Sequence, residues 1–155
     1  MTVEIPGSYT LSLEHLVLDF NGTLACEGVL LEGVTARLEA LSAHLKIHVL
    51  TGDIFGKVRE QLADGPWAVT ILSSQGQAEA KAAYVEKLGA LGVVCIGNGR
   101  NDCQMMETAA LSLAVIQQEG AAAATLLAAD VALRSITDAL DLLILPRRLM
   151  ATLRL

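Results

Sequence analysis

Short apolar segments alternate along the chain with segments of helical periodicity, and this alternation constrains the fold more than any other feature. Six apolar runs are suited to strands: 16–20, 46–50, 68–72, 93–96, 111–116 and 130–133. Between them, apolar residues recur on one helix face, at Val34, Leu38, Leu41 and Leu45 and again at Ala78, Val85 and Leu88. Strands that alternate with helices predict an α/β fold in three layers, with a mainly parallel sheet covered by helices on both faces.

The ends of the chain lie outside this alternation. Polar and apolar residues alternate on both sides of Pro6-Gly7-Ser8, which is typical of a small edge hairpin. We expect residues 1–14 to form this hairpin, residues 15–145 the core, and residues 146–155 a C-terminal helix that packs on the core or on a neighbouring molecule. The length of 155 residues and the absence of repeats favour one domain without a cap domain.

Charge and composition exclude several classes of partner. The chain has 11 Lys and Arg against 17 Asp and Glu, a net charge of −6, and only 3% aromatic residues, so we expect no nucleic-acid partner. Apolar stretches stay below the roughly 18 residues that cross a bilayer, and the N-terminus has no basic segment followed by an apolar one. We therefore expect a cytoplasmic protein without a membrane partner, whose three cysteines are reduced.

Three apolar runs end in polar residues beside glycine. These endings are Asp19-Phe20-Asn21-Gly22, Thr51-Gly52-Asp53 and Gly97-Asn98-Gly99. Ligands of open parallel sheets bind beyond the carboxyl ends of the strands, and glycine lets backbone N–H groups approach phosphate oxygens closely. The endings therefore predict a site for a small anion at one edge of the sheet.

Two carboxylates belong to the same predicted edge. Asp19 closes an apolar run, where an ionised carboxylate is costly unless it is paired or bound to a metal. Asp102 follows the fourth run. Mg²⁺ commonly takes one or two carboxylates together with waters and a substrate phosphate, so this pair favours magnesium. An isolated Asp-x-Asn-Gly would more often be a turn or cap, but the companion endings favour the site.

Lys81 is the candidate cation for this site. It lies three residues after Ala78 and four before Val85, and so belongs to the apolar stripe, whereas Lys87 points elsewhere. Two interpretations stay open at this point. Lys81 either meets a buried anion or extends along apolar neighbours so that its ammonium reaches water.

In order along the chain, these segments resemble the four motifs of the haloacid dehalogenase-like (HAD-like) phosphohydrolases, and within them the phosphorylation domain of P-type ATPases and its soluble relatives. Residues 16–24 resemble the nucleophile motif, residues 49–53 the second motif, Lys81 the third and residues 97–102 the fourth. Each motif is weak alone, but their combination is specific. The resemblance implies a Rossmann-like, HAD-like fold and a phosphatase activity.

The resemblance also implies roles for particular residues. Asp19 would attack phosphorus to form an aspartyl-phosphate, a known use of a carboxylate nucleophile. Thr51 and the Gly52 amide, with Asn21 and Gly22, would hold phosphate oxygens, and Lys81 would balance their charge. The cofactor would be Mg²⁺, bound by Asp19, the Asn21 carbonyl oxygen and Asn98, with Asp102 supporting it or Lys81.

Two departures from the family pattern predict slow turnover. Typical family phosphatases have Asp as a general acid and base two residues after the nucleophile, whereas this chain has Asn21. An amide cannot exchange a proton at neutral pH, so general acid–base help worth roughly 10²–10⁴-fold is expected to be missing. Asn98 replaces the first acid of the fourth motif, which predicts weaker metal binding. P-type ATPases also lack an acid two residues after the nucleophile, and they keep a long-lived aspartyl-phosphate.

Short spacings between the motifs leave no room for a large cap or a nucleotide-binding domain. The expected substrate is a small phosphorylated molecule, with a homo-oligomer neighbour covering the site, or else a phosphorylated macromolecule. The alternative to an enzyme is a catalytically degenerate binding or regulatory module that keeps the fold. A dinucleotide-binding domain is disfavoured because Asp102 stands where its third glycine would be, and a receiver domain because Asp19 has no acidic partner after the first core strand.

Overall fold

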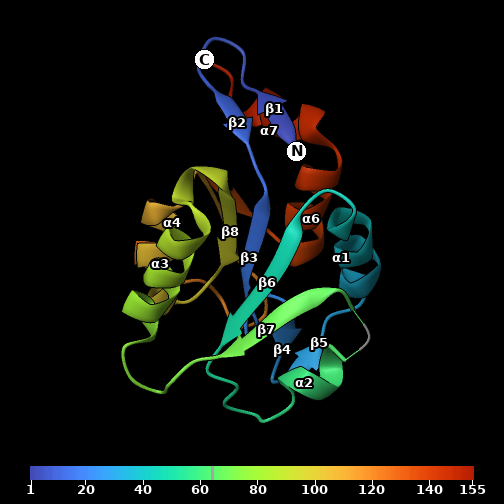
Figure 1. Ribbon diagram of the computed structural model, residues 1–155, viewed down its shortest axis with the longest axis vertical. Coiled ribbons are helices and arrows are strands. Elements are labelled where there is room, and N and C mark those ends of the chain that lie inside the picture. Colours follow the sequence, from blue (N-terminus) through green and yellow to red (C-terminus); the bar gives the residue numbers. More distant parts are fainter. Residues whose placement is uncertain (64) are drawn as a thin grey trace.

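The computed structural model describes residues 1–63 and 65–155, and a six-stranded parallel sheet runs through the middle of the molecule (Figure 1). The strand order is β10-β9-β8-β3-β6-β7, and every neighbouring pair is parallel. The strands are β3 (His15–Asp19), β6 (Lys46–Thr51), β7 (Trp67–Ile71), β8 (Val93–Gly97), β9 (Leu111–Val115) and β10 (Val131–Leu133). The predicted α/β fold is confirmed, and each expected strand overlaps an observed one almost completely.

Helices cover both faces of the sheet. On one face α3 packs against α4 and α4 against α5, while α1 packs against α6 on the other (Figure 1). The bounds of these helices are α1 (Val34–Ser42), α3 (Gln77–Leu88), α4 (Cys103–Thr108), α5 (Ala123–Ala128) and α6 (Ile136–Ile144). The helix expected from the stripe that ends at Leu45 stops at Ser42, and Leu45 is instead buried just before β6.

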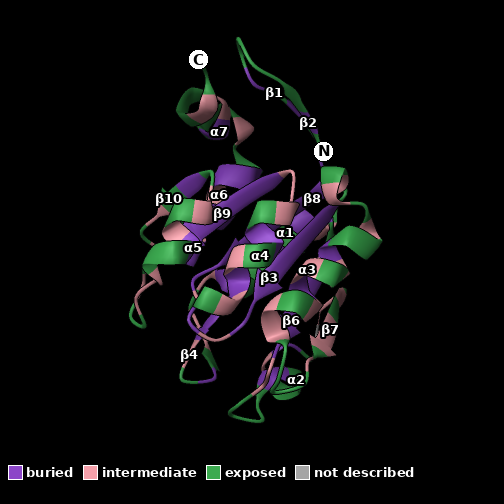
Figure 2. Cartoon of the chain, turned by 90° about the vertical axis from the view of Figure 1, so that its left-hand side faces the viewer, coloured by how far each residue is buried: buried purple, intermediate pink, exposed green. Residues whose placement is uncertain are grey.

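The two covered faces explain why the strands are apolar throughout. In β3, Leu16 and Leu18 belong to the apolar cluster that includes α1 and α6, whereas Val17 belongs to the cluster with Val85 of α3. Alternate side chains of a strand point to opposite faces, so both sets are removed from water. Figure 2 shows the resulting concentration of buried residues in the sheet. Burial on both sides leaves the strand ends as the place for polar chemistry.

The N-terminal residues form a separate two-stranded antiparallel sheet of β1 (Thr2–Glu4) and β2 (Thr10–Ser12). The C-terminal helix α7 (Pro146–Leu153) contacts β1, and its Leu149 is fully buried in the core of the same chain. Both elements lie at the end of the molecule away from the carboxyl ends of β3 and β6 (Figure 1). Among the described residues, no helix is long and apolar enough to cross a membrane.

The remaining short elements frame the carboxyl edge of the sheet. Two residues each form β4 (Ala25–Cys26) and β5 (Val29–Leu30), which pair antiparallel just after β3. The helix α2 (Val58–Gln61) follows β6, and the 3-10 turns η1 (Ala90–Gly92) and η2 (Arg100–Asp102) precede and follow β8. The chain runs from β3 to β6 and β7 on one side and to β8, β9 and β10 on the other, so the direction of sheet growth reverses at β3. Such a reversal opens a crevice for ligands at the carboxyl ends.

Candidate active site

A pocket of about 260 Å³ lies at the carboxyl ends of β3, β6 and β8. Five of the residues predicted from the sequence line it: Asp19, Asn21, Thr51, Gly52 and Asn98. They meet because β8, β3 and β6 are neighbours in the sheet. Gly22 lies against Asn98, while Lys81 and Asp102 are fully buried next to Asp19. A larger pocket of about 520 Å³ lies at the opposite edge of the sheet and contains none of these residues.

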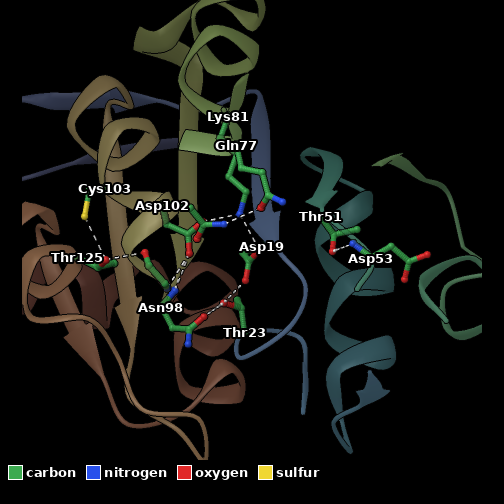
Figure 3. A network of polar contacts seen from close by, with 12 residues as sticks. Asp19, Thr23, Thr51, Asp53, Gln77, Lys81, Asn98, Asp102, Cys103 and Thr125 are labelled. Carbon is green, nitrogen blue, oxygen red and sulfur yellow. Dashed lines mark hydrogen bonds and ion pairs between the residues drawn. The ribbon is translucent and has the colours of Figure 1, made fainter. Parts of the chain in front are cut away.

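Lys81 lies between two carboxylates in the interior. Its Nζ donates to Asp19 Oδ1 at 2.7 Å and to Asp102 Oδ1 at 2.6 Å (Figure 3). The side chain has no exposed surface, because α3 turns the face that carries Lys81 and Val85 toward the sheet. Of the two interpretations of Lys81, the structure supports the buried ion pair, and Lys87 is exposed. One positive charge thus faces two negative charges, which leaves the buried cluster net negative.

The pKa values of the cluster follow from this imbalance. Burial, followed by the charge of Asp102, raises the pKa of Asp19 to about 7, although Lys81 opposes both effects. Burial alone would lower the pKa of Lys81, but the two carboxylates outweigh it and raise that pKa above its ordinary value. The lysine is therefore a permanent cation in the site, and Asp19 is the group that titrates near neutral pH.

Asp102 holds the cluster in place. Its Oδ2 accepts the backbone N–H groups of Asn98 at 3.0 Å and of Gly99 at 2.9 Å, while Oδ1 accepts from Lys81. The close approach depends on Gly97, where an added Cβ would lie 2.5 Å from Asp102 Oδ2. Since protein donors occupy both carboxylate oxygens, the contacts of Asp102 are those of a support for Lys81 and for the loop after β8.

Asn98 and Thr23 complete the floor of the pocket. Asn98 Nδ2 donates to the carbonyl oxygen of Gly120 at 3.0 Å, which turns Oδ1 toward the hydroxyl of Thr23 at 3.2 Å. The same hydroxyl lies 3.4 Å from Asp19 Oδ2, and its single proton serves only one of the two acceptors at a time. Gly22 has φ 79°, and a Cβ there would lie 2.4 Å from Asn98 Nδ2.

Oxygen atoms in the pocket fit a hard divalent cation. Asn21 Oδ1 is buried and has no hydrogen-bond partner among the described residues. Asp19 Oδ2 makes a long contact of 3.4 Å with the Thr23 hydroxyl, and Asn98 Oδ1 lies 3.2 Å from the same hydroxyl. Within residues 1–63 and 65–155 no three His, Cys, Asp or Glu side chains are grouped for a metal. The donor set is therefore one carboxylate with amide or carbonyl oxygens, which suits Mg²⁺ only when waters and a phosphate complete its shell.

Thr51 and Gly52 form the wall that faces Asp19. Thr51 is buried, and its Oγ1 accepts the N–H of Asp53 at 2.9 Å (Figure 3). Asp53 adopts φ 46°, and its Oδ1 accepts the backbone N–H groups of Lys57 and Val58, which begin α2. An added Cβ on Gly52 would lie 2.5 Å from Gln77 Nε2. The turn after β6 is thus held so that the backbone at Gly52 borders the pocket directly.

Sequence reasoning assigned no individual role to several lining residues. Asp53, Gly99 and Asn101 belong to the predicted motifs, whereas Ile54, Gln77 and Glu119 were missed. A signal existed for Gln77, which precedes Lys81 by four residues and so shares its helix face. Its Oε1 accepts from Asn101 Nδ2 at 2.9 Å. Glu119 stands before Gly120 after β9, in the same polar-beside-glycine pattern as the other strand ends. It accepts the N–H of Glu27 at 3.1 Å and so connects two loops at the pocket mouth.

One cysteine and two buried histidines make side-chain contacts away from the pocket lining. Cys103 Sγ lies 3.2 Å from Thr125 Oγ1, and Cys26 is a free thiol in β4. His48 lies between His15 and Tyr84, with ring nitrogens 3.0 Å from His15 Nδ1 and from the Tyr84 hydroxyl. Burial lowers the pKa of both histidines, so this chain of hydrogen bonds is neutral at physiological pH.

Comparison with known sequences yields one informative relative. No family model matches the chain. An uncharacterised protein of Methanocaldococcus jannaschii is 45% identical over 62 residues, which make up 40% of this chain and 67% of that protein. The two chains belong to the same family, and the name of the relative records no activity.

Three solved structures of bacterial proteins share this architecture. The cobalt-bound deoxy-D-mannose-octulosonate 8-phosphate phosphatase of Haemophilus influenzae has a TM-score of 0.70 at 18% identity, over 88% of this chain and 90% of that chain. The corresponding phosphatase of Moraxella catarrhalis, solved with magnesium, phosphate and the sugar acid, has a TM-score of 0.70 at 16% identity, over 86% of each chain. A HAD-family protein of Streptomyces avermitilis has a TM-score of 0.64 at 19% identity, over 92% of this chain and 85% of that chain. The chain therefore has the HAD-like fold, and at these identities the likeness establishes the fold alone.

Proposed function

We propose that this chain is a HAD-type phosphohydrolase that works through a phosphoryl group on Asp19. The observation that carries the proposal is the position of the Asp19 carboxylate, which ends the central strand, borders the pocket and is held by a fully buried lysine. A buried carboxylate with a fixed cation is costly to maintain for structure alone. The carboxylate is a suitable nucleophile, because Oδ1 pairs with Lys81 while Oδ2 is free of that ion pair and the residue borders the pocket.

The remaining wall of the pocket supplies the positions that a transferred phosphoryl group needs. Thr51, Gly52 and Asn21 line the same cavity as Asp19, and Gly22 lies behind this lining against Asn98. Phosphoryl transfer depends mainly on positioning and on balancing charge around the phosphoryl oxygens. In this proposal these groups hold the oxygens, while Lys81 offsets the negative charge that Asp19 and Asp102 bring to the interior.

A divalent cation is part of the proposal. The oxygens of Asp19, Asn21 and Asn98 would hold Mg²⁺, which when bound neutralises charge on the substrate phosphate. The Moraxella structure, which was solved in complex with magnesium and phosphate, supports this assignment by analogy of fold. With only one carboxylate in the donor set, we expect magnesium affinity to be low and to depend on the phosphate.

Slow turnover and a small substrate are further parts of the proposal. Asn21 offers no proton to a leaving group and cannot take one from water. A pocket of about 260 Å³ has room for a phosphoryl group with a small substituent, or for the phosphorylated side chain of a larger molecule. A neighbouring copy of the chain would shield such a site from water, and the expected location is the cytoplasm.

A binding or regulatory module is the second candidate. The observation that favours it is the neutrality of Asn21 and Asn98, which removes a proton carrier and a charged metal ligand from the pocket. In that case the site would hold phosphate or a phosphorylated partner without turnover. The two candidates differ in whether Asp19 reacts.

Hydrolysis of 4-nitrophenyl phosphate and a panel of small phosphate esters, with and without Mg²⁺, separates the candidates. The phosphohydrolase predicts turnover that requires Mg²⁺ and is lost in Asp19→Asn. Glu86→Gln is the matched control, because it removes one carboxylate from an exposed position of α3 outside the pocket. Equal silence of native protein and Asp19→Asn on every ester would contradict the enzyme and favour the binding module.

A further inference from the structure

The side chains around Asp19 make hydrogen bonds, but none of them is a ready proton donor for a leaving group. Among the described residues, the side chains that line the pocket are carboxylates, amides, one hydroxyl and one apolar group. Amides do not exchange protons at neutral pH, and the hydroxyl of Thr51 holds its proton far too tightly. No histidine, cysteine or lysine among residues 1–63 and 65–155 lines the cavity.

Lys81 does not fill this gap. It is fully buried, lies outside the pocket lining and donates to Asp19 and Asp102. Both of these acceptors are carboxylate oxygens at 2.6–2.7 Å in the interior, so the ammonium is directed away from the cavity. The cation thus balances charge without serving as an acid toward a group inside the cavity.

The two carboxylates at the mouth act as acceptors. Asp53 accepts the N–H groups of Lys57 and Val58 at 3.0 and 3.1 Å, and Glu119 accepts the N–H of Glu27 at 3.1 Å. The contacts of both side chains are thus those of hydrogen-bond acceptors. A leaving group in this pocket therefore departs without a proton from the protein.

We infer, on the premise of the proposed function, that the substrates of this site are acyl phosphates, in which the phosphoryl group is joined to a carboxylate. A carboxylate departs as a stable anion and needs no acid. The oxygen of an alcohol departs as a strongly basic alkoxide, and it needs the proton that this pocket does not supply. This substrate class differs from that of the octulosonate 8-phosphate phosphatases of similar fold, whose names specify a phosphorylated sugar acid.

The reaction balances without a protein acid. An oxygen of Asp19 forms a bond to phosphorus while the bond from phosphorus to the acyl oxygen breaks, and its electron pair leaves with the carboxylate product. The charge of −3 is the same on both sides: carboxylate plus acyl phosphate gives phosphoryl-aspartate plus carboxylate. Water then attacks phosphorus, Asp19 leaves as a carboxylate, and both protons of the water remain on the inorganic phosphate.

The mouth of the pocket suits the organic part of such a molecule. Ile54 lines the cavity and is 77% exposed, and Phe55 beside it is 44% exposed. Phe55 packs close to Gly28 of the β4–β5 turn, where an added Cβ would lie 2.8 Å from the Phe55 Cβ. An acyl chain that extends from the phosphoryl position would meet this apolar rim rather than the two carboxylates.

A leaving-group series tests the inference. We would measure kcat/KM at saturating Mg²⁺ for acetyl phosphate, 4-nitrophenyl phosphate, phenyl phosphate and glycerol phosphate. The native chain should lose rate steeply as the leaving group becomes more basic, with glycerol phosphate lowest. Asn21→Asp introduces a carboxyl group beside Asp19 and should raise glycerol phosphate turnover by about 10²–10⁴-fold while changing acetyl phosphate little. A change in metal affinity would instead shift all four substrates together.

Asn101→Asp is the matched control, because it adds the same charge to the pocket lining from η2. It should not restore glycerol phosphate selectively. A second readout is the mass of the acid-quenched native protein after acetyl phosphate, which should increase by one phosphoryl group and should not increase in Asp19→Asn.

Each possible result decides between the inference and the proposed function. Equal kcat/KM of the native chain for glycerol phosphate and acetyl phosphate would overturn the inference but leave the proposed phosphohydrolase activity intact. Selective restoration of glycerol phosphate turnover by Asn101→Asp would have the same consequence. Absence of both turnover and phosphoryl mass with every compound would overturn both. A steep fall of kcat/KM with leaving-group basicity in the native chain, and a shallower fall in Asn21→Asp, would support both the inference and the proposed function. If Asn21→Asp does not fold, the kcat/KM series of the native chain alone decides.

Discussion

Lys81 is the side chain on which the buried charges of the site depend. It lies within 2.7 Å of Asp19 and 2.6 Å of Asp102, and Lys81 and Asp102 are wholly inaccessible to water. Removal of one partner from a buried ion pair leaves uncompensated charge in the interior. The lysine is therefore essential for the stability of the site as well as for its charge.

Lys81→Met tests this dependence. We expect a loss of about 3–5 kcal/mol in the free energy of unfolding at pH 7, because two buried carboxylates would remain without a cation. Lys87→Met on the exposed face of α3 is the control and should change it by less than about 0.5 kcal/mol. Urea denaturation followed by circular dichroism measures both, and equal effects of the two variants would contradict the assigned contacts.

Asp19→Asn should make the metal-free protein more stable at neutral pH. The folded-state pKa of Asp19 is raised from 3.8 to about 7, so the folded chain holds its proton more tightly than the unfolded chain. The stability from this group is complete below the unfolded pKa and is lost as pH rises through about 7. Relative to native protein, Asp19→Asn should gain about 1–3 kcal/mol at pH 8 and much less at pH 4.

The pH dependence is the informative part of that experiment. Urea midpoints of both proteins at a series of pH values, without divalent cations, give the difference directly. A difference that stays constant from pH 4 to pH 8 would show that Asp19 is not the titrating group. A difference that shrinks as the pH rises would reverse the sign required by burial.

At the scale of elements, the loops after β3, β8 and β9 fit together because of glycines at defined positions. Gly22 has φ 79° and lies against the side chain of Asn98. Gln117 connects the loop after β9 to the same turn, since its Nε2 donates to the carbonyl oxygens of Gly22 and Thr23 at 3.1 and 2.8 Å. The geometry of the pocket floor thus depends on contacts between loops that are distant in sequence.

Gly22→Ala and Gly56→Ala separate backbone strain from crowding. Both residues have positive φ, but a Cβ at Gly56 meets nothing within 4 Å, whereas one at Gly22 lies 2.4 Å from Asn98 Nδ2. Gly56→Ala should cost about 1–2 kcal/mol of stability and little activity. Gly22→Ala should cost more and should abolish Mg²⁺-dependent hydrolysis, as measured by unfolding and by 4-nitrophenyl phosphate turnover. Retention of full activity in Gly22→Ala would contradict the packing of Asn98.

The sequence was sufficient for the elements but not for these loop contacts. The strands were predictable because both faces of β3, β6 and β8 are buried, which makes each strand a short continuous apolar run. Asp19 and Thr51 were predictable for the same reason, because polar residues stand out at the ends of such runs. Lys81 was predictable from its position on the apolar stripe of α3. The contacts of Thr23 and Glu119 depend on how separate loops approach one another, and local sequence carries no information on that approach.

At the scale of the whole molecule, the fold separates stability from chemistry. The hairpin β1–β2 and the helix α7 close one end of the core (Figure 1). The pocket lies at the carboxyl ends of β3, β6 and β8, away from these elements. The net charge of −6 disfavours a bound phosphate and favours a bound cation, but the proposed cation ligands include only one carboxylate, that of Asp19. The cation and the phosphate should therefore bind more tightly together than either does alone.

Thermal unfolding in the presence of magnesium tests the cation site without an assay of activity. Ligand binding to the folded state stabilises it by RT ln(1 + [L]/Kd), about 1.4 kcal/mol when the ligand is at tenfold its Kd. We expect 10 mM Mg²⁺, a concentration on the order of its expected Kd, to raise the Tm of the native chain slightly. Asn98→Asp should show a larger increase because it adds a second charged ligand, and Asp19→Asn should show none. An equal Mg²⁺ effect in all three proteins would indicate binding elsewhere.

The most direct test of the central claim is the identification of the phosphorylated residue. The native protein would be quenched in acid during turnover of 4-nitrophenyl phosphate with Mg²⁺, reduced with borohydride, and mapped by peptide mass spectrometry. The account predicts conversion of the Asp19 side chain, and of no other carboxylate, to the reduced alcohol that marks a phosphoryl-aspartate. Turnover accompanied by an unmodified Asp19, or by modification of a different residue, would contradict it.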